Sequence, residues 1–330
     1  FTGGFDAGPS ISKIFLDVAL FLRALWQVSV KKYDVIYTNE ESSLFGAFMN
    51  IIGMPHVYGM HSSMPMQLKD WNFSTSKTLL RMFEALERFI IHHSDVLVAI
   101  SGNVGDVAKK IDPDATVITI EDTAVVSDEK IASKKAVAAL RASLGLQRKK
   151  CVVYTGTFFV LQNLELLIDS VPGVVKTMPD VIFVLVGGEP SEIARLQQRV
   201  DALGVKNNVL LIEKRPITDM PAFLGLADVL VSPRSIGING TLKLYSYLNA
   251  GKAVLCTDCP IHNQLVQEPA VILAAPEPKS WSYALKRLLA DASFRKRTGA
   301  LGKRFLEEHY SYDRFKSRLS QAVKTAASRK

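Results

Sequence analysis

Two cationic side chains and a loop of small polar residues come together in one stretch, residues 228–257. Its first part, residues 228–232, is mostly apolar and predicts a buried strand. Arg234 follows that strand, and the helix predicted over residues 242–250 carries Lys243 in its first turn. Because the free N–H groups of a helix start attract negative charge, the stretch predicts a binding site for an anion such as a diphosphate.

The predicted site also includes residues around this helix start. They would cap the helix, offer N–H groups to a ligand or share a helix face with Lys243: Asn239, Gly240, Thr241, Leu242 and Ser246. The alternative is a plain strand–loop–helix crossover whose loop only turns the chain, since a fold does not by itself specify a function.

Glycines and a histidine follow three other predicted strands. Gly156, the pair Gly187 and Gly188, and His61 each come after a run of apolar residues. Glycine permits positive φ and a close approach by a ligand, although none of these glycines forms a GxGxxG dinucleotide fingerprint. His61 would lie at the carboxyl end of its strand as a catalytic candidate. A turn role for the glycines and a structural role for the histidine remain the alternatives.

The three cysteines include a CxxC pair, Cys256 and Cys259, with His262 close behind. Such a pair could be a thiol redox site or part of a three-ligand zinc site. Cysteine is among the most buried residues, and no thioredoxin-like pattern surrounds the pair, so buried structural thiols are the favoured interpretation. The sequence shows no cluster of metal ligands, and no metal or other cofactor is predicted.

The length and the order of elements predict an α/β protein of two domains. The chain has 330 residues, 48% of them apolar, with no long uncharged run that could span a membrane. Continuous apolar strands alternate with helices, which is typical of parallel sheets. The strands are predicted at residues 34–38, 56–60, 95–101, 116–120, 151–155, 181–186, 208–212, 228–232, 253–257 and 270–273.

The central stretch resembles the nucleotide-sugar site of retaining glycosyltransferases of family 4, the group 1 type with the GT-B fold. Ala250-Gly-Lys-Ala-Val254 stands where that family has A-G-K-P-V, and Pro233-Arg234 with Lys243-Leu-Tyr-Ser-Tyr-Leu248 is similar to one subgroup. The resemblance covers roughly residues 34–312. It implies two Rossmann-like, doubly wound parallel-sheet domains with a cleft between them. Residues 1–130 would form the acceptor-side domain, residues 131–311 the nucleotide-sugar domain, and the last helix, 312–330, would cross back to the first domain.

The resemblance implies a hexosyltransferase-type activity. Such an enzyme transfers a sugar from a nucleotide-sugar donor to a hydroxyl on a glycan or lipid-linked acceptor, with retention. His61 would contact the transferred sugar, because related enzymes carry a similar H-[ST]-S sequence. Gly156, Gly187 and Gly188 would mark loops that face the donor.

The sequence departs from the family at several positions. Ile238 and Ser246 stand where many members have two glutamates, and Thr157 and Gln162 stand where an Arg and a Lys clamp the diphosphate. We therefore expect Arg234 and Lys243 to replace the clamp. Two alternatives stay open: a nucleotide-sugar epimerase of GT-B type, and a non-catalytic binding or partner protein that kept the fold.

The charge distribution predicts a partner surface and a location. The net charge is +8, and residues 292–330 hold 11 Lys and Arg against three acidic residues. This basic segment could dock on an anionic membrane surface, although a solvated helix face is the alternative. No nucleic-acid-binding module accompanies the charge. The sequence predicts a cytoplasmic protein, peripheral at the inner face of the membrane.

The start of the chain also supports an expectation. The family's first strand and Gly-rich loop are missing, and the chain begins with Phe1. We therefore expect a chain truncated at its N-terminus, with fewer strands in the first sheet than in the second and an exposed edge or apolar patch beside it.

Overall fold

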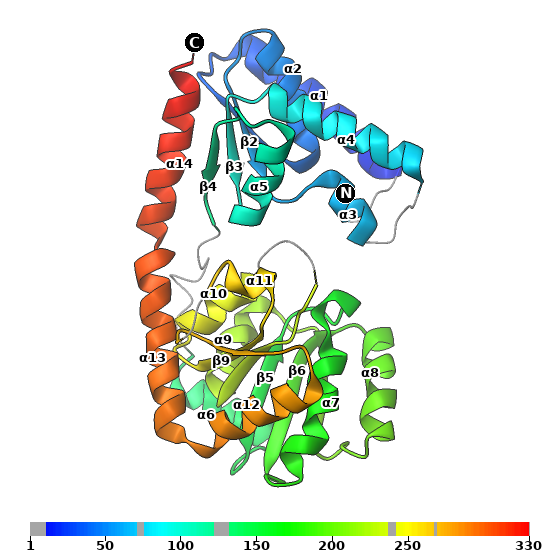
Figure 1. The fold of residues 1–330 in the computed structure, drawn as a ribbon, viewed down its shortest axis with the longest axis vertical. Coiled ribbons are helices and arrows are strands. Elements are labelled where there is room, and N and C mark those ends of the chain that lie inside the picture. Colours follow the sequence, from blue (N-terminus) through cyan, green and yellow to red (C-terminus); the bar gives the residue numbers. More distant parts are fainter. Residues whose placement is uncertain (1–10, 71–75, 122–131, 237–241, 267–268, 330) are drawn as a thin grey trace. The chain divides into compact units, whose positions relative to one another are not determined.

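A computed structural model of the chain describes residues 11–70, 76–121, 132–236, 242–266 and 269–329 (Figure 1). It divides into two compact units. The first unit comprises residues 1–121 and 316–330, and the second comprises residues 122–315. The domain boundary predicted between residues 130 and 131 falls within the segment 122–131, which lies outside the described residues.

The first unit contains a four-stranded sheet in which every neighbouring pair of strands is parallel. The sheet has the order β1-β2-β3-β4, with strands β1 (Ile36–Asn39), β2 (His56–Met60), β3 (Val96–Ala99) and β4 (Val117–Thr119). The helices of this unit are α1 (Ile11–Val30), α2 (Ser43–Ile51), α3 (Met64–Asp70), α4 (Lys77–His92) and α5 (Gly102–Ile111), with the short 3₁₀ turn η1 (Glu40–Ser42) after β1.

The second unit contains a six-stranded parallel sheet of order β10-β9-β8-β5-β6-β7. Its strands are β5 (Lys150–Thr155), β6 (Val181–Gly188), β7 (Val209–Glu213), β8 (Val229–Ser232), β9 (Ala253–Thr257) and β10 (Ile272–Ala274). Its helices are α6 (Lys134–Ser143), α7 (Leu164–Val175), α8 (Pro190–Ala202), α9 (Met220–Leu226), α10 (Leu242–Asn249), α11 (Pro260–Asn263), α12 (Pro278–Ala290) and α13 (Ala292–His309), with the 3₁₀ turns η3 (Val160–Gln162) and η4 (Ile217–Asp219).

Successive residues of β5 show how the second sheet is covered on both faces. Val152 and Tyr154 pack in one apolar cluster, while Cys151 and Val153 pack in another. Side chains alternate between the faces of a strand, so the two clusters lie on opposite sides of the sheet. The first cluster is closed by α7, α8 and α12, and the second by α9, α10 and α13. The unit is therefore doubly wound, as predicted.

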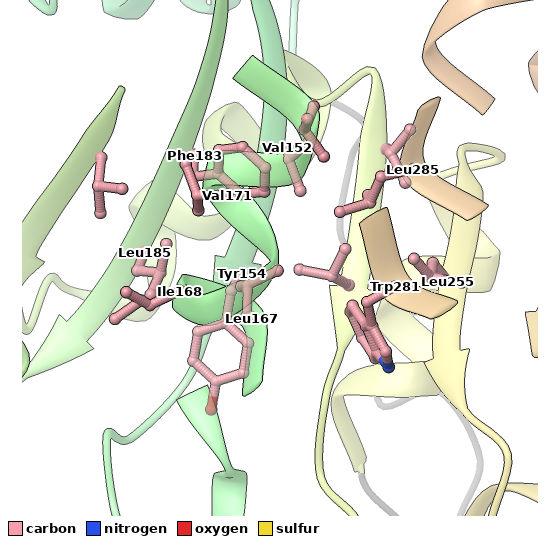
Figure 2. Packing of buried hydrophobic residues seen from close by; sticks show 14 of the residues in the cluster. Val152, Tyr154, Leu167, Ile168, Val171, Phe183, Leu185, Leu255, Trp281 and Leu285 are labelled. Atoms are coloured by element: carbon pink, nitrogen blue, oxygen red, sulfur yellow. The ribbon is translucent and has the colours of Figure 1, made fainter. Parts of the chain in front are cut away.

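The first cluster is anchored by Trp281 of α12, which is fully buried (Figure 2). Its indole lies near Leu255 of β9, while Leu167 and Val171 of α7 lie over β5 and β6. Ser282 donates a hydrogen bond of 2.7 Å to the carbonyl oxygen of Ser170, which ties α12 to α7. This packing fixes the sheet whose carboxyl edge carries the predicted anion site.

Helix α14 (Tyr312–Ala327) belongs to the first unit from residue 316 onward. Arg318 donates hydrogen bonds to the carbonyl oxygen of Thr119, at 2.9 Å, and to the carboxylate of Glu121, at 3.0 Å. Arg329 donates to the carbonyl oxygen of Asp95 at 2.8 Å. Two cations of the basic C-terminal segment are therefore engaged in holding the helix to the first sheet.

Among the described residues, the first sheet has four strands and the second has six. Apolar side chains of α1 and α2 are also exposed in the first unit, including Leu22, Trp26 and Ile51. Both features were expected for this unit.

Two short helices were not predicted from the sequence. α3 begins at Met64, shortly after the strand that precedes His61, and α11 covers residues 260–263 after the CxxC pair. Each has a Pro within its first two residues, where proline is tolerated because the N–H group has no helical partner. Gly187 and Gly188 also end β6 itself, with an irregularity in its pairing with β7, rather than following the strand.

Candidate functional site

The carboxyl ends of three adjacent strands bring the predicted residues of the second unit together. β5 lies between β8 and β6 in the sheet, so Gly156, Gly188 and Arg234 come from neighbouring strands. In open parallel sheets, this edge is where ligands bind. The fold thus places the two glycine segments and the cation on one edge, as their positions after strands predicted.

The glycines allow the ends of β5 and β6 to touch. Gly156 has φ +133° and donates its N–H to the carbonyl oxygen of Val186 at 2.9 Å. Gly187 has φ +122°, and a Cβ on it would lie 2.3 Å from the carbonyl oxygen of Gly156. A Cβ on Gly188 would meet the ring of Phe158 at 2.4 Å. All three positions therefore need glycine for the packing of the strand ends, and this structural role accounts for them without a ligand.

Lys243 reaches from the first turn of α10 to the end of β5. Its Nζ donates hydrogen bonds to the hydroxyl of Tyr154, at 2.6 Å, and to Oε1 of Gln162, at 2.8 Å. The ammonium also lies 4.0 Å from the centre of the Tyr154 ring. A Cβ on Gly156 would lie 3.0 Å from Nζ, so a larger residue there would crowd the cation. Tyr154, Gln162 and Gly156 together form the seat of this ammonium group.

The partners recorded for Lys243 in the described part of the chain are neutral, which makes this cation unusual. Burial lowers the pKa of Lys243 well below its ordinary value, and the nearby positive charge of Arg234 lowers it further. A buried charge without a counter-ion is costly, and its protonated form would be stabilised by an arriving anion. The surroundings of Lys243 are therefore electrostatically suited to a negatively charged group.

The loop after β8 is tied to the loop after β5. Asn163 donates from its side-chain amide to the hydroxyl of Ser235 at 2.8 Å. Asn163 itself has φ +51°, a left-handed conformation that asparagine adopts more readily than most residues. Arg234 donates from Nε to the carbonyl oxygen of Ile236 at 2.9 Å. The half-buried Arg234 is thus held on a fixed loop within electrostatic reach of Lys243.

Leu242 and Ser246, the other described residues of the predicted site, lie on α10. Leu242 is exposed and Ser246 is half-buried. Asn239, Gly240 and Thr241 lie outside the described residues. Gly251 closes α10 with φ +64°, the left-handed conformation typical of a helix C-terminus.

The sequence interpretation missed Tyr154, Asn163 and Ser235. Tyr154 looks like an ordinary core residue of a buried strand, and its ring does pack in the apolar cluster. Only the three-dimensional contact shows that its hydroxyl faces Lys243, 89 positions away along the chain. Asn163 offered a weak signal, since asparagine before a helix favours a cap or a left-handed turn.

The CxxC pair does not form a reactive thiol site in this structure. Cys256 is fully buried, and burial raises the pKa of its thiol far above the ordinary value. Cys259 precedes α11, and its Sγ lies 3.4 Å from Nδ1 of His262 and 3.6 Å from the carbonyl oxygen of Arg234. Among the residues described, no group of three His, Cys, Asp or Glu is placed to hold a metal ion.

His262 is a buried hydrogen-bond bridge behind the site. Its Nδ1 lies 2.9 Å from the carbonyl oxygen of Thr257, which can only accept, so Nδ1 carries the proton. Its Nε2 therefore accepts from the hydroxyl of Ser232 at 2.9 Å. Burial lowers the pKa of His262 to about 4.

Acidification should destabilise the protein through His262. Its pKa in the folded protein, about 4, lies below the value of about 6.5 expected in the unfolded chain. The stability that neutral His262 contributes is therefore fully present above pH 6.5 and is lost as the pH falls towards 4. Between pH 7 and pH 5, this residue alone should cost about 2 kcal/mol of unfolding free energy. Urea unfolding at both pH values measures this loss of unfolding free energy. The parent should lose about 2 kcal/mol more than His262→Gln. Equal losses in the two proteins would contradict a lowered pKa of His262.

In the first unit, His61 lies just beyond β2 and is exposed. Its Nε2 is 3.2 Å from Oδ1 of Asn39, the last residue of β1. β1 and β2 are adjacent parallel strands, so both residues come from the carboxyl edge of the first sheet. The structure thus places His61 beyond the carboxyl end of its strand; its catalytic role stays a prediction.

Comparison with known proteins supports a relationship to glycosyltransferases. The family model described as "Glycosyl transferases group 1" matches residues 149–291, within the second unit. Spore coat protein SA of Bacillus subtilis is 22% identical over 183 residues, which cover 53% of this chain and 48% of that protein. A GDP-mannose-dependent phosphatidylinositol monomannoside mannosyltransferase of Mycolicibacterium smegmatis is 29% identical over 96 residues, 29% of this chain and 25% of that one. This chain thus spans about half the length of the first relative and less of the second.

The crystal structure of Anabaena HepE in complex with UDP has the same fold. It superposes with a TM-score of 0.78 at 17% sequence identity, over 97% of this chain and 85% of that one. The predicted fold class, an α/β protein with two parallel-sheet domains of GT-B type, is confirmed. The family match and the fold support the group 1 glycosyltransferase family, the coarser part of the predicted resemblance.

Proposed function

We propose that this chain is a retaining glycosyltransferase of hexosyltransferase type. It would transfer a sugar from a nucleotide-sugar donor to a hydroxyl acceptor on a glycan or a lipid-linked molecule. The observation that supports this most is the ammonium of Lys243, seated on Tyr154 and Gln162 at the carboxyl edge of the second sheet. In the resemblance, position 162 belongs to the diphosphate clamp. Lys243 would supply from α10 the charge that Gln162 lacks.

The chemistry of this proposal rests on the leaving group. As the bond between the sugar and the diphosphate breaks, negative charge grows on the diphosphate oxygens and positive charge grows on the sugar carbon. Fixed cations aimed at the developing charge lower the barrier. Lys243 and Arg234 would stabilise the leaving diphosphate, together with the N–H groups at the start of α10. The donor is a substrate, and no metal or other cofactor is part of the proposal.

A panel of nucleotides and nucleotide sugars tests the proposal. UDP, GDP, ADP, UDP-glucose and GDP-mannose are added to the chain, and the unfolding temperature is followed. A ligand that binds the folded state must raise its apparent stability, by about 2.7 kcal/mol at a hundredfold excess over Kd. At least one diphosphate should raise the unfolding temperature where the matching nucleoside does not. A panel with no stabilising nucleotide would contradict the proposal.

The non-catalytic alternative is favoured by one observation. Ile238 and Ser246 stand where the resemblance has two acidic residues that bind the donor. A partner protein of this kind would bind nucleotide sugars weakly or not at all, and it would form no product. An epimerase would change the donor sugar without an acceptor. Product analysis with and without an acceptor therefore separates the three functions.

His61 is proposed as the residue of the first unit that contacts the transferred sugar. His61→Ala should lower turnover by about 100-fold, the scale of a lost orienting contact, while the urea midpoint stays unchanged. The exposed His92 on α4 gives a matched control, because His92→Ala removes a histidine away from this strand end. Equal turnover in His61→Ala and the parent would return His61 to a structural role.

The membrane surface remains a proposal for the basic C-terminal segment. None of the described helices is both long enough and apolar enough to cross a membrane. Arg318 and Arg329 are engaged with the first sheet, and Arg304 is paired with Glu308 at 2.7 Å. Docking at the inner face of the cytoplasmic membrane would rest on other exposed cations of the segment, such as Lys296 and Lys324. Sedimentation should then require vesicles with anionic lipid and weaken with salt.

A further inference from the structure

A buried carboxylate holds the loop that carries His61. Glu87 of α4 is only 2% exposed, and it accepts two hydrogen bonds from that loop. The hydroxyl of Ser63 donates to Oε2 at 3.0 Å, and the backbone N–H of Met64 donates to Oε1 at 2.9 Å. Ser63 is itself 4% exposed. Ser63 and Met64, which follow His61 and Ser62, are thus tied to α4, 24 and 23 positions further along the chain.

The two hydrogen bonds to Glu87 make any displacement of this loop costly in free energy. Burial raises the pKa of Glu87, whereas the hydrogen bonds from Met64 and Ser63 lower it. A buried acidic group must keep its donors, because leaving it unsatisfied costs free energy. A displacement of residues 63 and 64 would remove both donors recorded for this carboxyl group. The loop is therefore fixed by Glu87 rather than by its own residues alone.

A second contact orients the imidazole ring. The Oδ1 atom of Asn39 can only accept a hydrogen bond, so Nε2 of His61 carries the proton at 3.2 Å from it. Nδ1 then keeps its lone pair and can accept a hydrogen bond from a hydroxyl group. The side chain of Asn39 lies over Gly59, where a Cβ would come within 2.0 Å of Oδ1. The lack of a side chain at position 59 leaves room for this contact.

We propose that Glu87 and Asn39 are positioning residues for His61: Glu87 fixes the loop and Asn39 sets the direction and tautomer of the ring. The inference rests on the proposed function of His61 for its catalytic consequence. The placement of the loop by Glu87 stands on the described contacts alone. The hydroxyl that Nδ1 would accept from belongs to the sugar or to the acceptor.

Amide hydrogen exchange tests the fixing of the loop without any substrate. Glu87→Gln keeps the shape of the side chain but removes its charge and replaces one of the two accepting oxygens by an NH₂ group, which cannot accept a hydrogen bond. The amide of Met64 should exchange at least tenfold faster than in the parent. Glu84→Gln is the matched control, since Glu84 is exposed on the same helix and should leave that amide unchanged. Unchanged exchange at Met64 in Glu87→Gln would overturn the inference.

A double-mutant cycle tests the catalytic consequence, with UDP-glucose and GDP-mannose as donors. Glu87→Gln and Asn39→Ala should each lower kcat by about 10- to 100-fold, the cost of misplacing a reacting group by about 1 Å. In a His61→Ala background, neither change should lower kcat further, because both residues act through His61. Full additivity would overturn the positioning role. Where the parent forms no product with any donor, the proposed function fails, while the exchange at Met64 still decides the inference about the loop.

Discussion

Lys243→Met should weaken the binding of UDP by about 10- to 150-fold. This range corresponds to the 1.5–3 kcal/mol of a charge-assisted hydrogen bond. Methionine keeps an unbranched side chain of similar length but removes the charge that lies beside Tyr154 and Gln162. Isothermal titration of parent and variant measures the ratio of the two Kd values. Lys206→Met is the control, because Lys206 is exposed in the turn before β7, away from the carboxyl edge.

Proton uptake on binding gives a second test of the role of Lys243. Burial lowers the pKa of Lys243, and a bound diphosphate would raise it again. Binding should therefore take up protons, and the measured enthalpy should depend on the ionisation enthalpy of the buffer. In Lys243→Met this dependence should shrink. Arg234→Gln should weaken binding within the same range as Lys243→Met, while UDP bound equally tightly by parent, Lys243→Met and Arg234→Gln would place the clamp elsewhere.

Gly187→Ala should lower the unfolding free energy by about 2–4 kcal/mol. A side chain is strained at φ +122°, and its Cβ would lie 2.3 Å from the carbonyl oxygen of Gly156. Because this neighbour is backbone rather than a flexible side chain, one of the two strand ends must move. The displacement would also disturb the seat of Lys243, so diphosphate binding should weaken with stability.

Gly204→Ala is the matched control for this change. Gly204 also has a positive φ, +68°, but beyond its own chain neighbours no described atom lies within 4 Å of the position that its Cβ would take. Gly204→Ala should therefore lower the unfolding free energy only by the cost of a side chain at positive φ, about 1 kcal/mol. Urea unfolding of the three proteins gives the comparison. If Gly187→Ala costs no more than Gly204→Ala, the close packing of the β5 and β6 ends is wrong.

The elements with strong local patterns were predictable from the sequence. β2 and β9 have the expected bounds, because a continuous apolar run marks each of them. The short α3 and α11 were not predicted, since four to seven residues give no helical period to read. The general edge of the site was predictable too, because strand ends meet at one edge of a parallel sheet.

The contacts that define the site were beyond the sequence. Lys243 and Gln162 are 81 positions apart, and Lys243 and Tyr154 are 89 apart. The sequence alone shows that Lys243 places a positive charge in the first turn of a helix, where the helix dipole disfavours it. The sequence does not show which side chains accept hydrogen bonds from the ammonium group of Lys243. Glu87, on an amphipathic helix, gave no sign that it would be buried under the His61 loop, because that contact depends on how α4 packs against α3.

The central claim is that the carboxyl edge of the second sheet binds the diphosphate of a nucleotide sugar through Lys243. Isothermal titration with UDP and GDP, on the parent and on Lys243→Met side by side, tests it most directly. The account predicts saturable binding of at least one diphosphate by the parent, weakened about 10- to 150-fold in the variant. Binding of neither nucleotide by the parent, or equal affinity in the two proteins, would contradict it.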